Sequence, residues 1–172
     1  MSNLHDYDLL TKIANKYFGI IDEYLDLRGI DLHGRDLSNA DLTYCDLRYS
    51  DFSNIVATEA IFAFSNISDS LFERAEFNIS TLAEITAKNV LFRESVITTT
   101  SFNHSILCGS DFSLARINRT DMVLCDFENC ILDKIELDDV SLSSTKIPKS
   151  QKKWIIANDG KYDDDPRNIE WI

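Results

Sequence analysis

The chain has 172 residues, of which 44% are hydrophobic and 27% charged, a composition typical of a chain that folds around a core. Its formal net charge of −12 argues against direct binding of nucleic acid, because a phosphate backbone requires lysine and arginine to displace its counterions. The sequence shows neither an apolar run of about 18 residues nor a basic leader, so we expect a cytoplasmic protein that makes no use of a membrane.

Residues 1–24 precede a repeat and are expected to form an N-terminal helical cap. Within this segment, residues 6–18 carry an apolar stripe at helical spacing, and Gly19 is a typical C-terminal stop. The stripe consists of Leu9, Leu10, Ile13, Ala14, Tyr17 and Phe18. The pattern favours a helix that covers the open end of the next domain, and docking of a partner on this helix is the alternative.

From Leu27 to Ile147 an apolar residue occupies every fifth position without interruption, and we call this series the centre ladder. Eight of the ten phenylalanines of the chain belong to it. A small-residue ladder lies two positions before each centre, where most residues are Ala, Cys, Ser or Thr. Five residues advance an α-helix by about 500° and leave a strand on its opposite face, so neither element keeps the centres together. The backbone must instead turn once per repeat and form coils that stack.

The position directly before each centre is aspartate six times in succession, and we call these residues the acidic ladder. It consists of Asp26, Asp31, Asp36, Asp41, Asp46 and Asp51. Aspartate side chains accept hydrogen bonds from the nearby backbone in tight turns, so the fold alone is one reason for their presence.

Residues 39–43 (Asn-Ala-Asp-Leu-Thr) and 44–48 (Tyr-Cys-Asp-Leu-Arg) resemble the pentapeptide-repeat family, whose unit is loosely Ala-Asp/Asn-Leu-x-x. The resemblance covers about residues 25–149. It implies an all-β solenoid, a right-handed quadrilateral β-helix with four repeats in each coil and therefore about six coils here. It implies no particular activity, because the fold does not determine the function.

Some members of this family are understood to inhibit or protect DNA gyrase by imitating DNA, which gives the acidic ladder a functional interpretation. Residues 25–149 carry a net charge of −9, which over about 30 Å of stacked coils is about one charge per 3.3 Å. Duplex DNA carries about one charge per 1.7 Å. The acidic DNA mimic directed at a type II topoisomerase is therefore the alternative function and not the preferred one.

No catalytic, metal or cofactor site is predicted, and we expect a protein that is not an enzyme. The three histidines, His5, His33 and His104, show no metal-ligand spacing. Cys45, Cys125 and Cys130 fall on the small-residue ladder, where cysteine behaves as an apolar filler, and a disulfide between the last two is left open. Cys108 projects outward and is the thiol that we expect to react.

In the middle coils the position before the centre loses its aspartate and becomes apolar. Phe64 also points outward, one corner beyond Ile61, and the candidate protein-binding face consists of Val56, Ile61, Phe64, Leu71, Leu91 and Val96. Such residues either form a contiguous interface or only stabilise the sheet as cross-strand ladders. We expect a non-catalytic interaction scaffold, a monomer or homodimer, which binds an unidentified protein through this face.

Residues 150–172 follow Pro148 and are expected to form a short C-terminal helix, with Ser150 as its N-cap, and a tail. Apolar residues in this segment either cap the last coil or form a dimer contact. They are Trp154, Ile155, Ile156 and Trp171.

Overall fold

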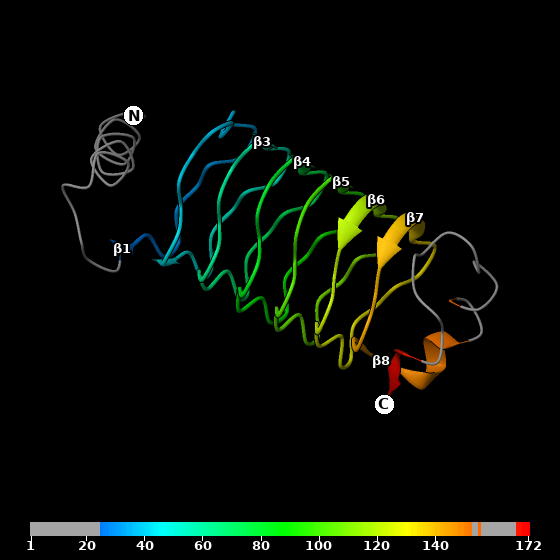
Figure 1. The fold of residues 1–172 in the computed structure, drawn as a ribbon. Coiled ribbons are helices and arrows are strands. Elements are labelled where there is room, and N and C mark those ends of the chain that lie inside the picture. Colours follow the sequence, from blue (N-terminus) through cyan, green and yellow to red (C-terminus); the bar gives the residue numbers. More distant parts are fainter. Residues whose placement is uncertain (1–24, 153–154, 156–167) are drawn as a thin grey trace, which may run out of the picture.

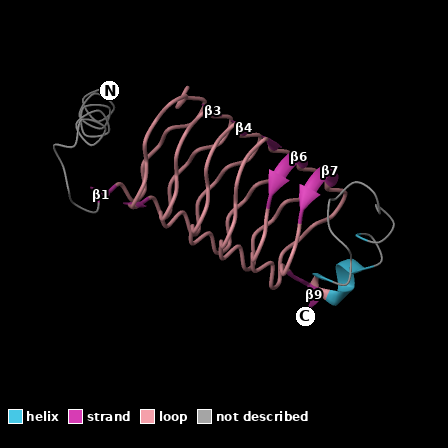
Figure 2. Cartoon of the chain, in the orientation of Figure 1, coloured by secondary structure: helices cyan, strands magenta, loops and turns pink. Residues whose placement is uncertain are grey.

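A computed structural model describes residues 25–152, residue 155 and residues 168–172, and it has the form of a four-sided β-helix (Figure 1). Most of each coil is turn and loop, and the strands are short (Figure 2). The strands are β1 (Leu25–Asp26), β2 (Cys45–Asp46), β3 (Val56–Thr58), β4 (Glu76–Asn78), β5 (Val96–Thr98), β6 (Arg116–Asp121), β7 (Glu136–Ser141), β8 (Lys146–Ile147) and β9 (Glu170–Trp171). The predicted fold class is therefore confirmed.

Successive coils pair in parallel, each repeat with the fourth repeat after it, as in the register Val56↔Glu76 between β3 and β4. Strands β3 to β7 form a five-stranded sheet on one side of the coil, and single bridges such as Leu71↔Leu91 connect the coils on the other sides. The solenoid makes about seven turns, slightly more than the six expected. At the C-terminal end β9 pairs with β8 and adds a layer that the repeat pattern did not indicate.

The centre ladder forms the core, because every one of its residues is buried. Phenylalanines from successive coils stack with their rings nearly parallel: the centroids are 4.7 Å apart for Phe52 and Phe72, and 5.4 Å apart for Phe72 and Phe92. These distances match the spacing of about 4.8 Å between paired strands. One coil therefore places its aromatic ring directly on the ring of the coil before it.

The small-residue ladder is buried from Cys45 onward, and its hydroxyl groups connect neighbouring coils. The Ser70 hydroxyl donates to the carbonyl of Leu47 at 2.8 Å and accepts the backbone N–H of Ser50 at 3.0 Å. It thereby satisfies two backbone groups of the preceding turn that are closed off from water. Arg35, on the same ladder in the first coil, is exposed, as its place at the open end predicts.

Every corner of the coil has a positive φ. The residue two positions after a centre lies at φ between 48° and 73° at each of the 24 corners from Gly29 to Ser144, and only three of these residues are glycine. This conformation costs roughly 1 kcal/mol or more for other residues, and most for β-branched ones such as Ile79 and Thr99. The hydrogen bonds between coils must offset that cost.

The two ends of the chain extend beyond the repeat. The predicted N-terminal cap over residues 1–24 lies outside the described residues. At the other end a short 3-10 helix, η1 (Lys149–Gln151), is followed by helical residues at Lys152 and Ile155. Its N-cap is Pro148, without a side-chain capping bond, so the prediction of Ser150 in that role was wrong.

Replacing Phe72 with alanine should lower the free energy of unfolding by about 3–5 kcal/mol, because it opens a cavity in the middle of the aromatic stack. Urea denaturation followed by circular dichroism measures the effect. The matched control is Phe64→Asn, which removes an exposed phenylalanine at a corner and should cost less than about 1 kcal/mol. Equal losses in the two variants would contradict the stacked core.

Candidate functional site

The acidic ladder takes part in the turns of the coil. Each of its six carboxylates accepts the backbone N–H of the residue two positions further on, with N–O distances of 2.8–3.3 Å. Asp26, Asp31 and Asp36 are exposed, whereas Asp46 is buried. This geometry gives each of the six aspartates a structural role that does not require a ligand.

Two arginines neutralise part of the acidic ladder. Arg28 lies 2.7 Å from a carboxylate oxygen of Asp26, and Arg48 lies 2.6 Å from one of Asp46. The hydrogen bonds from Arg28 lower the pKa of Asp26 to about 2, and those from Arg48 lower the pKa of Asp46. Two of the six carboxylates of the acidic ladder, those of Asp26 and Asp46, are therefore already paired with arginine.

Asp111 is the most buried carboxylate in the ion pairs of the described residues. Arg93 Nε lies 2.6 Å from Asp111 Oδ2, and only 5% of the Asp111 side chain is exposed. Its other oxygen accepts the backbone N–H of Ser113 at 2.8 Å. Burial raises the pKa of Asp111, but the hydrogen bonds from Ser113 and Arg93 outweigh it and leave the pKa below its ordinary value.

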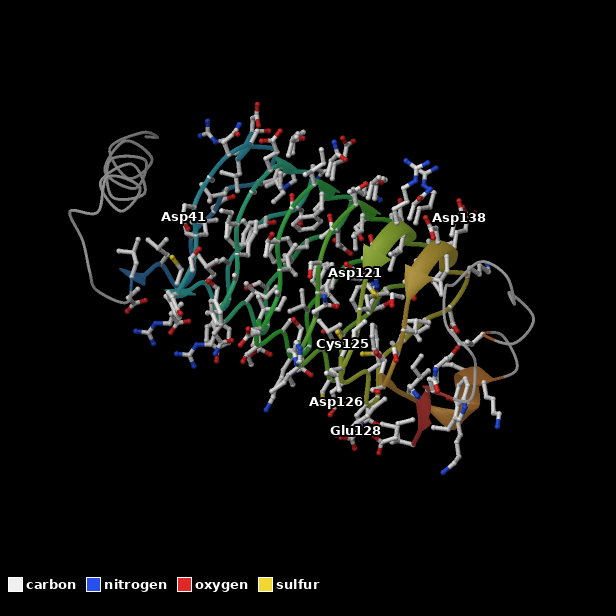
Figure 3. The ribbon with its side chains drawn as sticks, viewed as in Figure 1. Asp41, Asp121, Cys125, Asp126, Glu128 and Asp138 are labelled. Carbon is white, nitrogen blue, oxygen red and sulfur yellow. The ribbon has the colours of Figure 1, made fainter. Side chains whose placement is uncertain are left out.

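Cys108, Asp126 and Glu128 gather on neighbouring coils, and Figure 3 shows the two acidic residues close together. Their three potential ligand atoms lie within 4.8 Å of one another, so these are residues that could hold a metal ion, although none was predicted. Lys146 competes for this position, with Nζ 3.4 Å from Asp126 Oδ2. Nothing else at this cluster points to a bound ion.

The cysteines are all free, including Cys125 and Cys130, between which a disulfide had been left open. Burial raises the pKa of both thiols to about 12. Cys108 is half-buried, and burial together with the Asp126 carboxylate raises its pKa as well. The raised pKa keeps the Cys108 thiol protonated and weakly nucleophilic, but Cys108 is less buried than the other three cysteines, so its greater reactivity among them stays a prediction.

The six residues of the candidate protein-binding face do not share one face. Val56 and Val96 lie on the β3–β7 sheet with Glu76 between them, and Leu71 pairs with Leu91 on another side. Ile61 lies on a third side, whose centres include Leu42, Phe62 and Leu82; we call it the Phe62 side. The assumption of a single face was wrong, because residues five positions apart occupy adjacent sides of a four-sided coil.

The six residues also differ in exposure. Val56, Ile61, Phe64 and Leu71 are exposed, by 36–41%. Leu91 and Val96 are only half-buried, as in a cross-strand ladder. The individual residues remain candidates for partner contact, whereas the single continuous face does not.

The structure adds Tyr44, which the sequence reasoning missed. Tyr44 and Phe64 occupy the same corner of successive coils, and their rings stack with centroids 4.8 Å apart and planes 11° from parallel. Tyr44 is 52% exposed and Phe64 41%. Their separation by four whole repeats was the available signal, because residues one full coil apart lie above one another.

The C-terminal apolar residues that can be placed act as a cap. Ile155 is buried over a small apolar cavity at the end of the coil. The cavity is lined by Met122, Phe127, Leu132, Ile135, Leu137, Leu142 and Ile147. Trp171, in β9, packs against the core, with Lys152 Nζ 5.2 Å from its ring centroid. Trp154 and Ile156 lie outside the described residues.

In the part of the chain that the structure describes, no helix is long and apolar enough to cross a membrane. The family model of pentapeptide repeats matches the sequence in eight copies, over residues 36–74 and 97–133. A search of curated proteins found no significant match.

Several solved structures resemble the coil. A pentapeptide repeat protein, Rfr23, from the cyanobacterium Cyanothece 51142 has a TM-score of 0.53 and 14% identity, covering 76% of this chain and 95% of its own. A pentapeptide repeat protein of the Arabidopsis thaliana thylakoid lumen has a TM-score of 0.43 and 16% identity, covering 73% and 77%. HetL, involved in heterocyst differentiation regulation in Nostoc sp. strain PCC 7120, has a TM-score of 0.38 and 17% identity, covering 80% and 79%. At 14% identity the likeness to Rfr23 concerns the fold alone.

Replacing Asp111 with asparagine should destabilise the protein more at pH 7 than in acid. The lowered pKa of Asp111 means that its stabilisation is present above the unfolded value of about 3.9 and disappears as the pH falls through the lower folded value. Asparagine can still accept the Ser113 N–H but no longer attracts Arg93. We expect a loss of about 1–3 kcal/mol at pH 7, measured by urea denaturation, and a smaller loss at about pH 3, below the unfolded pKa.

The matched control for this pair of measurements is Asp133→Asn, which replaces an exposed carboxylate on the next coil. Its free energy of unfolding should change little at either pH. An equal loss in Asp111→Asn at both pH values would contradict the ionic role of Asp111.

Proposed function

The chain is a pentapeptide-repeat protein, and we propose that it is a non-catalytic scaffold that binds a partner protein through the outer surface of its β-helix. The observation that carries this proposal is the presence of exposed apolar side chains at outward positions of an otherwise acidic rod. Ile61, Phe64 and Leu71 are each more than a third exposed, within a chain of net charge −12. Exposed apolar groups that lie together on a charged surface, as Ile61 and Phe64 do, are candidate sites of protein contact.

The interior supports an outer site. Centre residues fill the axis of the coil, and hydroxyl groups such as Ser70 are already bonded to backbone groups of the neighbouring coil. The small cavity under Ile155 is apolar and offers no polar group to orient a substrate. A partner therefore has to meet the chain on its outward side chains.

The alternative, a DNA mimic that acts on DNA gyrase, is less well supported. Its carboxylates would have to face the enzyme, yet those of the acidic ladder each accept a backbone N–H of their own turn. Arg28 and Arg48 also neutralise Asp26 and Asp46. Two of the six carboxylates of the acidic ladder are thus occupied by arginine, which leaves a shorter series of unpaired charges than a DNA mimic would present.

Affinity capture from cells that naturally produce the chain tests the scaffold. A variant in which the exposed and half-buried apolar residues are made polar should lose the partner that the natural chain retains, because contact depends on those side chains. The replacements are Val56→Thr, Ile61→Thr, Phe64→Asn, Leu71→Thr, Leu91→Thr and Val96→Thr. Threonine suits strand positions, and asparagine tolerates the positive φ of a corner.

The matched control makes Tyr49, Ile79 and Leu114 asparagine, which removes exposed apolar side chains of similar size at other corners. This control should retain the partner at the level of the natural chain. Failure to capture any heterologous protein in a stoichiometric amount, or retention of the partner by the six-residue variant, would contradict the proposal.

A further inference from the structure

One cluster of apolar residues is more sharply defined than the others, and we call it the aromatic patch: the exposed Tyr44, Ile61 and Phe64, with the buried Ala63 between the last two in the sequence. We propose that the aromatic patch binds a basic amphipathic helix of a partner protein, along the Phe62 side of the coil. This inference rests on the proposed scaffold function and names the docking site and the chemistry of the partner.

The patch offers rigid anchors. The rings of Tyr44 and Phe64 stack on each other. Ile61, on the Phe62 side just before the corner at Phe64, is 41% exposed. Backbone bonds between coils hold the corner in place, with Tyr44 N–H donating to Ala63 O and Phe64 N–H to Ala83 O, each at 3.1 Å. Aromatic side chains held in this way before binding lose little conformational freedom in a complex and are typical interface anchors.

The charges around the patch select a basic partner. Asp41 pairs with Ile61 across neighbouring coils, and Glu59 and Glu84 lie at corners before and after the patch. The outward positions of the Phe62 side and of its following corner, from Asp41 to Ser144, hold no lysine or arginine. A second copy of the chain would bring carboxylates against carboxylates at a net charge of −12 each, whereas lysine and arginine on a partner would complement them.

The backbone of this side favours a helix over an added strand. Leu42 N–H donates to Ile61 O at 2.7 Å, and Ile61 N–H donates to Ala40 O at 2.9 Å, so these backbone groups are already bonded between coils. Contact is therefore made by side chains, as when an amphipathic helix lays its apolar side on a partner. One helical turn rises about 5.4 Å and one coil about 4.8 Å, so a helix parallel to the rod places about one side chain per coil.

The neighbouring coils leave room for such a helix. Beyond the patch, the Phe62 side continues with small or uncharged outward residues over the next two coils, namely Thr81, Ala83, Ser101 and Asn103. These residues are half-buried, so their side chains project little from the flat side between the corners. A helix anchored on Tyr44 and Phe64 can extend along this surface without meeting a like-charged or bulky side chain.

Fluorescence anisotropy with synthetic peptides and the full chain tests the site. The probe is a labelled peptide of about 18 residues with leucine on one helical face and lysine elsewhere. Its controls are the same peptide with glutamate for lysine and a scrambled peptide without an apolar face. We expect the basic amphipathic peptide to bind at least about tenfold more tightly than either control.

The variant Tyr44→Asn/Phe64→Asn should weaken binding of the basic peptide at least about tenfold, because it removes both anchors. Asparagine occupies the equivalent positive-φ corners at positions 39 and 54, so the coil should tolerate these changes, and thermal unfolding verifies that it does. The matched control, Ile79→Asn/Leu114→Asn, removes exposed apolar corner residues elsewhere and should bind like the natural chain.

The contribution of charge is tested with Glu59→Gln/Glu84→Gln, which should weaken binding several-fold at about 50 mM salt and less at about 300 mM, where exposed charges are screened. The matched control is Asp133→Asn/Asp139→Asn, which removes two exposed carboxylates far from the patch along the chain. An identical effect of both pairs would show attraction by net charge alone and would overturn the site.

Other occupants give other results, each of which overturns the proposal. If Ile13→Asp/Phe18→Asp in the full chain raises peptide affinity about tenfold, the patch is covered by the chain's own N-terminal segment. If the natural chain sediments as a dimer and Tyr44→Asn/Phe64→Asn as a monomer, the occupant is a second copy. If the peptide still binds after both anchors are removed, the proposed site at the aromatic patch is wrong but the scaffold function is not affected. If the capture from cells finds no partner, the proposed scaffold function is wrong.

Discussion

The backbone of this protein bends at every fifth residue, and each bend places a residue at positive φ. Twenty-one of the 24 corner residues are not glycine, so the bends are not favoured by local preference alone. They persist because each coil lies one strand spacing from the next, where backbone groups bond across coils and the centre side chains stack. Stability therefore resides between coils, as in other repeat structures in which each unit contacts only its neighbours.

The same geometry divides the side chains by function. Centres fill the axis, small hydroxyl and thiol groups such as Ser70 and Cys125 lie against the turn of the preceding coil, and aspartates close their own turns. Two of the five positions in each repeat point into the interior, and the other three point outward. Residues that stack on the outside, such as Tyr44 and Phe64, are consequently arranged by the coil and displayed in fixed register, which suits recognition by a partner.

Much of the fold could be predicted from the sequence, because burial of every fifth residue produces an apolar period of five that no regular helix or strand has. The stacking of Phe52, Phe72 and Phe92 follows directly from that period. The corners could not be predicted, since residues such as Ile79 and Leu114 are poor indicators of positive φ and are held there by neighbouring coils. The added strand β9 also follows no repeat, because its register Lys146↔Glu170 does not span a whole number of repeats.

The candidate site was predicted less well, for a geometric reason. A linear list of apolar residues such as Val56, Ile61 and Leu71 becomes three different sides once the chain is wound in four-sided coils. Grouping the outward residues by whole coils joins Tyr44 to Phe64 and Leu71 to Leu91, and it places these two pairs on different parts of the coil. The arrangement of the outward side chains thus depends on the coil itself, which rises by a fixed distance with every four repeats.

Distance measurement by pulsed electron spin resonance tests that coil most directly. Spin labels at Glu59 and Asp139, four coils apart on one corner, should lie about 19 Å apart, and labels at Asn39 and Asp139, five coils apart, about 24 Å apart. Labels at Asn54 and Lys134, four coils apart on another corner, should reproduce the first distance. Narrow distributions that increase by one strand spacing per coil are the predicted result, and broad distributions or distances that do not increase with the number of coils would contradict it.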